Sequence, residues 1–342
     1  MPEAGFVELS KIPLRGAQLE AAMLLTPVRP EAASAEAFAL RRAFFPDEVT
    51  FHAPGLKRFK TSEYVGQEAT RFVSISVTGT ECALACEHCK THVLEGMTAL
   101  PKFDGSLFDL CCELAARGAR GALVSGGCDR RGRVPLLRHI PDLIRARREL
   151  GFTLRVHPGL PDEETTAGLS EIGLDGAMVD IIGDDATIRE VYHLDATTAD
   201  YEAVLERLER HGVHAVPHII LGLHFGQMRG ERRALEMIAR HARKFLVLVI
   251  LMPLTGTPMA GVSPPPVAEI ADFFIRARRA LPDTPVMLGC ARPLGRVKAE
   301  IDRAAIDAGL NGIAYPAEGI VAYAQARGLA PKFVDACCGV QW

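Results

Sequence analysis

The sequence predicts an α/β fold, a (β/α)8 barrel of the TIM type with parallel strands. Eight short apolar runs alternate with longer amphipathic stretches from Phe72 onward, a pattern typical of repeated βα units around a parallel sheet. At 342 residues and 48% hydrophobic composition, the chain can form one large barrel or two ordinary domains. Eight runs favour the closed barrel, and a six-stranded partial barrel followed by an unrelated tail is the alternative.

The predicted strands begin at Phe72, Gly121, Thr153, Gly176, His214, Phe245, Pro285 and Asn311. Helical patterns follow them, as in residues 198–212 and 267–282, where apolar residues recur every three or four positions. Active sites of such barrels lie at the C-terminal ends of the strands. We therefore expect the functional residues directly after the apolar runs.

The barrel is predicted to span residues 71–328, between an N-terminal extension and a C-terminal tail. The extension, residues 1–70, contains an alanine-rich helical stretch at 35–46, and we expect it to pack on the barrel or cover the substrate. The tail, residues 329–342, carries two adjacent cysteines and the only tryptophan. It lies outside the eight predicted units.

Charge and composition exclude several classes of function. A net charge of −3 gives no general attraction to nucleic acid or to an anionic membrane. No segment approaches the roughly 18 apolar residues of a membrane span, and the first residues lack the pattern of an export signal. Nine cysteines, an odd number, then favour reduced thiols and metal binding over disulfides. We expect a cytoplasmic protein.

Three cysteines form the most informative motif. Cys82, Cys86 and Cys89 follow the first apolar run and lie within eight residues. A zinc ribbon would need a second pair of ligands about a dozen or more residues later, and none follows at that distance. Iron–sulfur clusters usually have four thiolate ligands, so three thiolates leave one iron open. The alternative is a chance grouping of cysteines in a buried turn.

This spacing resembles the signature of the radical S-adenosylmethionine (SAM) superfamily. The resemblance implies a [4Fe-4S] cluster on Cys82, Cys86 and Cys89, whose open iron binds the amino and carboxylate groups of SAM. It also implies that an electron from the cluster cleaves SAM to a 5′-deoxyadenosyl radical. The three cysteines would then be the catalytic residues.

Further residues at the strand ends match SAM-binding segments of this superfamily. Gly126 and Gly127 resemble the stretch that binds the SAM amino group, although Cys128 replaces its acidic residue. Asp195 resembles the acid that binds the SAM ribose in biotin synthase-like enzymes, with a helix cap as the alternative role. His88 stands where relatives carry an aromatic residue, and the resemblance implies stacking on the adenine.

The remaining cysteines predict a second site. Cys128 and Cys290 follow the second and seventh strands, so both should point toward the mouth of the barrel, and the tail should fold over that mouth. Together with Cys337 and Cys338 they are predicted to hold an auxiliary [4Fe-4S] cluster, with Arg292 beside it as in biotin synthase. The alternative is a set of buried free cysteines.

The chain resembles the biotin synthase and lipoyl synthase group, and most closely the archaeal-type lipoyl synthases that work as a pair of radical SAM proteins. It departs from biotin synthase at Val216, and from ordinary lipoyl synthases because residues 1–81 contain no cysteine. The resemblance implies sulfur insertion into a protein-bound octanoyl chain. Partners would be an octanoylated carrier protein, a second radical SAM protein, and ferredoxin or flavodoxin. A radical methyltransferase, a cofactor-assembly enzyme and a non-catalytic iron–sulfur or zinc protein are the alternatives.

Overall fold

All eight predicted strands are present in one parallel sheet. The structure is a computed structural model that describes residues 30–54, 59–66 and 71–340. The predicted strands are β2 (Phe72–Ser76), β4 (Gly121–Ser125), β5 (Thr153–Val156), β6 (Gly176–Asp180), β7 (Ala215–Leu221), β8 (Leu246–Ile250), β9 (Val286–Leu288) and β10 (Gly312–Ala314). From β4 to β10 each strand pairs with its successor, so the C-terminal ends of these strands lie along one edge of the sheet.

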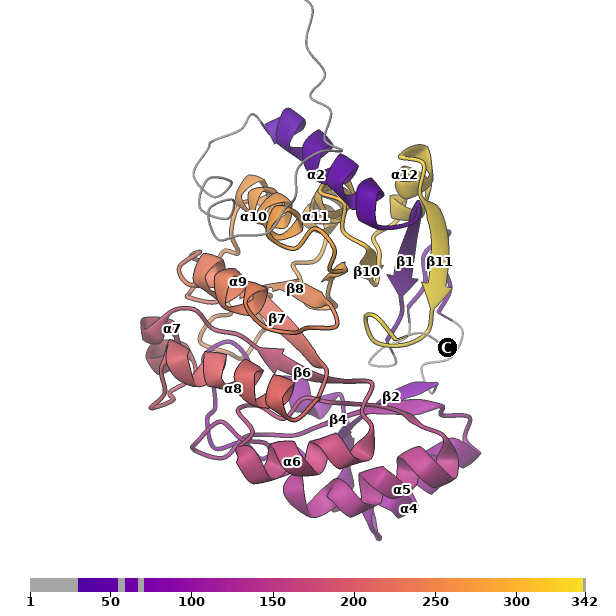
Figure 1. The fold of residues 1–342 in the computed structure, drawn as a ribbon, viewed down its shortest axis with the longest axis vertical. Helices are drawn as coiled ribbons and strands as arrows, with labels where there is room; N and C mark the ends of the chain where they lie inside the picture. Colours follow the sequence, from indigo (N-terminus) through magenta and orange to yellow (C-terminus); the bar gives the residue numbers. More distant parts are fainter. Residues whose placement is uncertain (1–29, 55–58, 67–70, 341–342) are drawn as a thin grey trace, which may run out of the picture.

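Three further strands extend the sheet at its two sides. They are β1 (Glu48–His52), β3 (Thr98–Ala99) and β11 (Ala330–Val334), which give the order β11-β1-β10-β9-β8-β7-β6-β5-β4-β2-β3. β1 and β11 come from the segments predicted as extension and tail. The predicted parallel α/β barrel is confirmed as a curled sheet (Figure 1), but no pairing among the described strands joins β3 to β11.

Helices cover the outer face of the curled sheet (Figure 1). They are α2 (Pro30–Phe44), α3 (His92–Glu95), α4 (Leu107–Ala116), α5 (Ile140–Leu150), α6 (Glu163–Ile172), α7 (Asp185–Val191), α8 (Thr198–Arg210), α9 (Glu231–Ala239), α10 (Val267–Ala280), α11 (Arg296–Asp307) and α12 (Ile320–Ala326), with 3-10 turns at Leu100–Lys102 and Leu137–His139. Within the described residues, no helix has both the length and the apolar character to cross a membrane.

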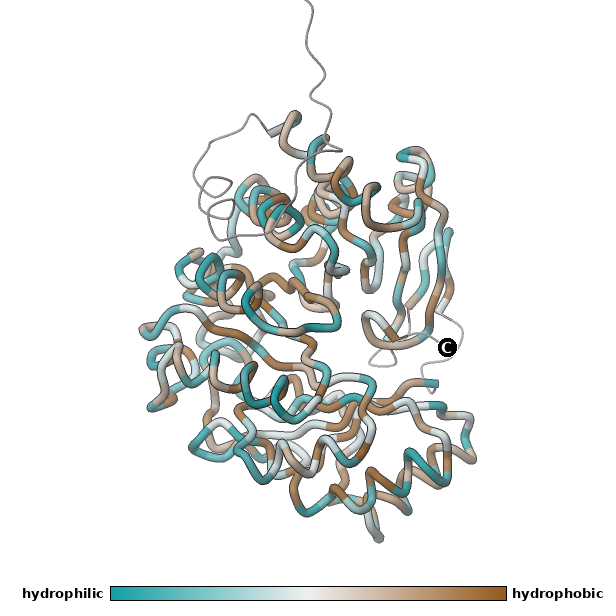
Figure 2. The backbone as a smooth tube through the Cα atoms, viewed as in Figure 1, coloured by the Kyte–Doolittle hydropathy of each residue, from teal (hydrophilic) through white to brown (hydrophobic). Residues whose placement is uncertain are grey.

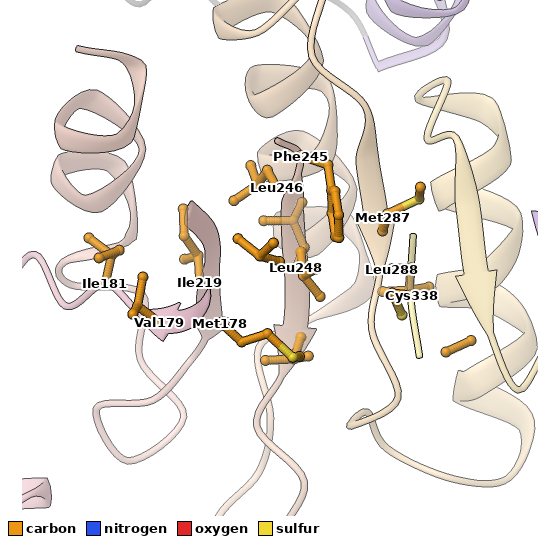
Figure 3. Packing of buried hydrophobic residues seen from close by; sticks show 14 of the residues in the cluster. Met178, Val179, Ile181, Ile219, Phe245, Leu246, Leu248, Met287, Leu288 and Cys338 are labelled. Carbon is orange, nitrogen blue, oxygen red and sulfur yellow. The ribbon is translucent and has the colours of Figure 1, made fainter. Parts of the chain in front are cut away.

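The core lies between the strands and the helices. Every residue of β8 is buried, which explains its continuous apolar run, since a parallel sheet covered on both faces has no polar side. Hydrophobic residues follow the strands and the inner sides of the helices (Figure 2). Cys338 of the tail belongs to the same buried cluster as Met287 and Leu288 of β9, and Figure 3 labels all three.

The tail turns into the curl of the sheet after β11. Ala336, Cys337 and Val340 pack with Phe72, the first residue of β2. The Gly339 amide donates to His52 Nε2 at 3.3 Å, and an added Cβ at Gly339 would lie 2.6 Å from the Phe245 ring. Both phenylalanines stand at the N-terminal ends of their strands. These tail residues therefore pack inside the curl of the sheet, and the expectation that the tail folds over the mouth stays a prediction.

Candidate functional site

The three-cysteine loop follows β2 directly and has a tightly wound backbone. Ala85, Lys90 and Thr91 adopt left-handed conformations, with φ of 46°, 41° and 68°. Such conformations cost residues other than glycine of order 1–3 kcal/mol each and persist only where surrounding contacts hold them. Here the Cys86 carbonyl accepts from the amides of Cys89 and Lys90 at 3.2 and 2.9 Å. The turn draws the thiols of one short segment together.

The thiols of this loop interact with one another and with backbone amides. A hydrogen bond between Cys86 and Cys89 lowers the pKa of Cys89 to about 7 against the effect of burial, and the Thr91 amide adds to this shift. The same bond, followed by burial, raises the pKa of Cys86. The Cys128 amide donates to Cys82 Sγ at 3.4 Å. Thiols that accept amide hydrogen bonds suit an iron–sulfur cluster, whose potential depends on such bonds.

Single-ion sites have a different arrangement. Within the described ranges, no group of three His, Cys, Asp or Glu side chains is arranged to hold one metal ion. A four-iron cluster places each thiolate on a separate iron, so its ligands surround a larger body than one ion. The donor set of the loop, three neighbouring thiols with amide donors, fits that group.

The glycine segment after β4 packs directly on the cysteine loop. The Gly127 amide donates to Thr78 Oγ1 at 2.7 Å, and the Ala83 amide donates to the Cys128 carbonyl at 2.8 Å. A Cβ at Gly127 would lie 1.9 Å from the Glu81 carbonyl oxygen, so this close approach requires glycine. Gly126 also faces Thr78, with an added Cβ 3.1 Å from its Oγ1. The structure thus joins Gly126, Gly127 and the cysteine loop, as their predicted common site requires.

The segment between α7 and α8 contacts the same loop. The Glu87 amide donates to the Val191 carbonyl at 2.9 Å, and His193 Nε2 lies 2.8 Å from Glu87 Oε1. Asp195 is exposed at the end of this segment. It does not cap α8, because that helix begins with a capping box of Thr197 and Asp200. The alternative role for Asp195 is therefore excluded.

His88 packs against Tyr192 of the same segment. Their ring centroids are 5.3 Å apart, and burial lowers the pKa of His88 to about 4 although Asp180 opposes the shift. His88 Nδ1 and the Tyr192 hydroxyl are both buried without a hydrogen-bond partner. Buried polar atoms without partners are rare in folded proteins. Two of them beside the cysteine loop are consistent with a polar group that binds there.

The other predicted cysteines fall into two places. Cys337 and Cys338 are buried and Cys290 is exposed. Burial raises the pKa of Cys337 to about 12, and the charge of Cys290 raises the pKa of both tail thiols. Cys128 instead interacts with Cys82 and Cys89.

The structure therefore brings Cys290, Cys337 and Cys338 together and separates Cys128 from them. The reason lies in the order and in the ends of the strands. Four strands lie between β4, which precedes Cys128, and β9, which precedes Cys290. Cys337 packs with Phe72, the first residue of β2, whereas Cys128 follows the last residue of β4. Cys128 thus belongs to the surroundings of the first motif, and its predicted place beside the tail cysteines is corrected.

The two arginines of this region have different surroundings. Arg292 pairs with Asp302 at 2.7 and 3.1 Å and donates to the carbonyls of Gly289 and Tyr315. Because every guanidinium nitrogen is engaged, Arg292 links the end of β9 to α11. Burial raises the pKa of Cys338 and the charge of Arg292 opposes this shift, so Arg292 lies near the tail thiols, and its role beside a cluster stays a prediction. Arg155 of β5 was not predicted. It is 1% exposed, donates to the Cys338 carbonyl, and its Nε has no partner.

Sequence reasoning also missed three polar residues on neighbouring strands. His157 follows β5, Asp180 ends β6 and His218 lies within β7. His157 Nε2 is 3.5 Å from Asp180 Oδ1, and the two imidazole centroids are 6.2 Å apart. A signal was available, because each is a charged or polar residue in or directly after an otherwise apolar run.

Comparisons with known proteins give likenesses of fold. No family model matches the chain, and no curated protein matches it. Methylornithine synthase (PylB) matches with a TM-score of 0.60 and 13% identity, over 92% of this chain and 93% of that one. HydG, a maturase of the [FeFe]-hydrogenase, matches with a TM-score of 0.63 and 12% identity, over 92% and 72%. HydG from Carboxydothermus hydrogenoformans gives 0.61 and 13%, over 93% and 76%. The chain has the fold of these enzymes.

Proposed function

We propose that this chain is a radical SAM enzyme. The observation that carries the proposal is the loop of Cys82, Cys86 and Cys89, which lies at the C-terminal end of β2 and accepts hydrogen bonds from backbone amides. PylB and HydG, which share the fold, are radical SAM enzymes. The C-terminal ends of barrel strands are also where active sites of such folds lie.

The residues of the site divide into cluster ligands and SAM-binding groups. Cys82, Cys86 and Cys89 would hold three irons of a [4Fe-4S] cluster, which supplies the electron that cleaves SAM. The Gly126–Gly127 backbone would line the binding site beside the loop, where only glycine can pack so closely. Asp195, free of any capping role, would accept hydrogen bonds from the ribose hydroxyls.

We further propose that the reaction is sulfur insertion, with a protein-bound octanoyl chain as substrate. The second cluster would bind Cys290 and Cys337. Among the thiols of the described chain, only Cys338 would add a further ligand. The support for this cluster is the buried Arg155, whose guanidinium interacts with both tail thiols and donates to the Cys338 carbonyl, and which forms no ion pair with a carboxylate of the described residues. A cluster with thiolate ligands carries negative charge, which would stabilise a buried cation that is otherwise costly. A second radical SAM protein and ferredoxin or flavodoxin are the proposed partners.

The test is a count of iron and sulfide on anaerobically reconstituted protein, combined with two assays. We expect about eight irons per chain, as two four-iron clusters require. Dithionite-reduced protein should form 5′-deoxyadenosine from SAM, and an octanoylated carrier protein with the partner enzyme should gain sulfur by mass spectrometry. If no deoxyadenosine forms, the chain is a non-catalytic iron–sulfur protein instead.

A cofactor-assembly enzyme or a radical methyltransferase is the second candidate. The fold likeness to the maturase HydG, over 92% of this chain, favours assembly. If the protein binds the iron of only one cluster and still forms deoxyadenosine, this second candidate replaces sulfur insertion as the proposed function.

A further inference from the structure

Glu87 of the three-cysteine loop holds the segment between α7 and α8 with both its backbone and its side chain. Its amide donates to the Val191 carbonyl at 2.9 Å, and its Oε1 accepts from His193 Nε2 at 2.8 Å. The Glu87 side chain is 19% exposed, so the protein shields this bond from most of the solvent. Two bonds from one residue to two positions of a neighbouring segment fix both the distance and the direction of that segment.

The backbone of this segment turns sharply at His193. Its φ is 58°, a left-handed conformation that is uncommon for residues other than glycine and that persists only where surrounding contacts hold it. Tyr192 before it is buried, whereas Asp195 two positions later is exposed. Among the described residues, Glu87 is the only hydrogen-bond partner of the His193 side chain. Glu87 therefore holds the ring at the point where the segment leaves the interior.

Glu87 also closes the loop on itself. Lys90 Nζ donates to the same Oε1 at 3.3 Å. Burial opposes a charge on Glu87, but the bonds from His193 and Lys90 outweigh it and lower its pKa. An ionised carboxylate only accepts hydrogen bonds, so the proton in the contact with His193 lies on Nε2. Since Lys90 directly follows Cys89, one carboxylate connects the end of the loop to His193.

This contact joins the neighbours of both groups that would bind SAM. Glu87 directly follows Cys86, one of the proposed cluster ligands. His193 precedes Asp195, the proposed ribose acceptor, by two positions, so their Cα atoms are at most about 7 Å apart. The hydrogen bond of 2.8 Å is thus a direct side-chain link between the loop of the cluster and the segment of the ribose acceptor.

We propose that Glu87 is a positioning residue, which holds His193 and so sets the span between the open iron and Asp195. A ligand held at both ends gains affinity only where the span between the two sites matches its length. Without Glu87 both contacts can still form, but the protein must first order the segment that carries Asp195. The inference rests on the proposed function, because it concerns the same SAM site. The alternative is a surface ion pair that contributes only to stability.

The test is a double-mutant cycle of Glu87→Leu and Asp195→Ala, measured as SAM affinity. Anaerobically reconstituted full-length proteins are titrated calorimetrically with SAM, and iron is counted on the same samples. Glu87→Leu should bind SAM about tenfold more weakly with its iron content unchanged, as one lost hydrogen bond predicts. Because Glu87 acts through the segment of Asp195, adding Glu87→Leu to Asp195→Ala should cause little further loss. Glu87→Gln keeps an acceptor for His193 and should restore most of the affinity.

Glu95→Leu is the matched control. Glu95 forms the same kind of pair with His92, at 2.9 Å, on α3 directly after the loop. Within the described chain no hydrogen bond connects this pair to residues 191–195. Glu95→Leu should therefore keep the SAM affinity of the wild type.

His193→Asn removes the same bond from its other side and leaves the cysteine loop intact. Asparagine adopts left-handed conformations more readily than most residues, so this variant adds little backbone strain. It should reproduce the tenfold loss, even if Glu87→Leu fails to hold its cluster. Wild-type affinity in His193→Asn, wild-type affinity in Glu87→Leu, or losses that multiply in the double variant would overturn the inference.

Deoxyadenosine formation separates this inference from the proposed function. If the wild type neither binds nor cleaves SAM, the proposed function fails and the inference falls with it. If the wild type cleaves SAM but Glu87→Leu and His193→Asn bind it equally well, only the positioning role of Glu87 is wrong.

Discussion

The two groups of cysteines differ in how the chain builds them. Cys82, Cys86 and Cys89 belong to one loop, where a hydrogen bond between Cys86 and Cys89 lowers the pKa of Cys89 to about 7 and raises the pKa of Cys86. Cys290 and the tail pair come from segments more than 40 positions apart in the printed sequence, and burial raises the pKa of both tail thiols. The first group is thus prepared for ligation by local backbone geometry, whereas the second depends on the whole sheet and on Arg155.

The sharpest test of the first group is Cys86→Ala. Loss of one of three thiolates should abolish SAM cleavage and remove about four irons, because a four-iron cluster does not survive on two protein ligands. Deoxyadenosine is measured by chromatography and the fold by circular dichroism. Cys112→Ala, on helix α4, is the control and should behave as the wild type. Normal deoxyadenosine formation in Cys86→Ala would sink the assignment.

The second group is tested by Cys337→Ala combined with Cys338→Ala. We expect iron to fall from about eight to about four per chain, with sulfur transfer lost and SAM cleavage kept. Point variants are preferable to truncation, because Ala336 and Val340 contribute to a buried cluster with Phe72. If the double variant retains all its iron, the tail thiols are simply buried side chains.

Asp195→Ala tests the link between the first group and SAM. Loss of a charge-assisted hydrogen bond of roughly 1.5–3 kcal/mol should weaken SAM binding about ten- to a hundredfold. Thermal stability should not change, because Thr197 and Asp200 cap α8. Thr197→Ala should show the reverse pattern, with stability reduced by about 1 kcal/mol and SAM affinity kept. Unchanged SAM affinity in Asp195→Ala would contradict the assigned role.

The smallest expected effect concerns the ion pair of His157 and Asp180. Asp180 raises the pKa of His157, so this contribution to stability is complete below pH 6.5 and is lost as the pH rises through the folded pKa. The lowered pKa of Asp180 contributes above pH 3.8, and its effect is lost as the pH falls through about 2.

Asp180→Asn should therefore reduce stability most between about pH 4 and 6.5 and should lower the pKa of His157. The pKa is measured by NMR titration of the His157 ring, and stability by thermal unfolding across that range. An unchanged His157 titration would show that Asp180 does not hold the imidazolium.

The sequence predicted what depends on local pattern. The eight central strands were visible because each is a short apolar run followed by a helix. β1 was not, because the run Glu48–His52 becomes a strand only through pairing with β10 and β11, far away in the sequence. The position of Cys128 was misjudged, and the buried ion pair of Arg292 was missed, for a similar reason. Neither the order of the sheet nor the Asp302 partner of Arg292 is readable from spacing.

β1 also has a consequence for how the molecule assembles. In the described sheet β11 is held by β1 alone, and these two strands are about 280 positions apart in the printed sequence. Parallel contacts of such high sequence separation form slowly, because a long loop must close before they contribute. This edge should therefore be among the last parts to fold and the first to exchange its amide hydrogens. Since the tail cysteines follow β11 directly, any fragment that lacks β1 would release them from the interior.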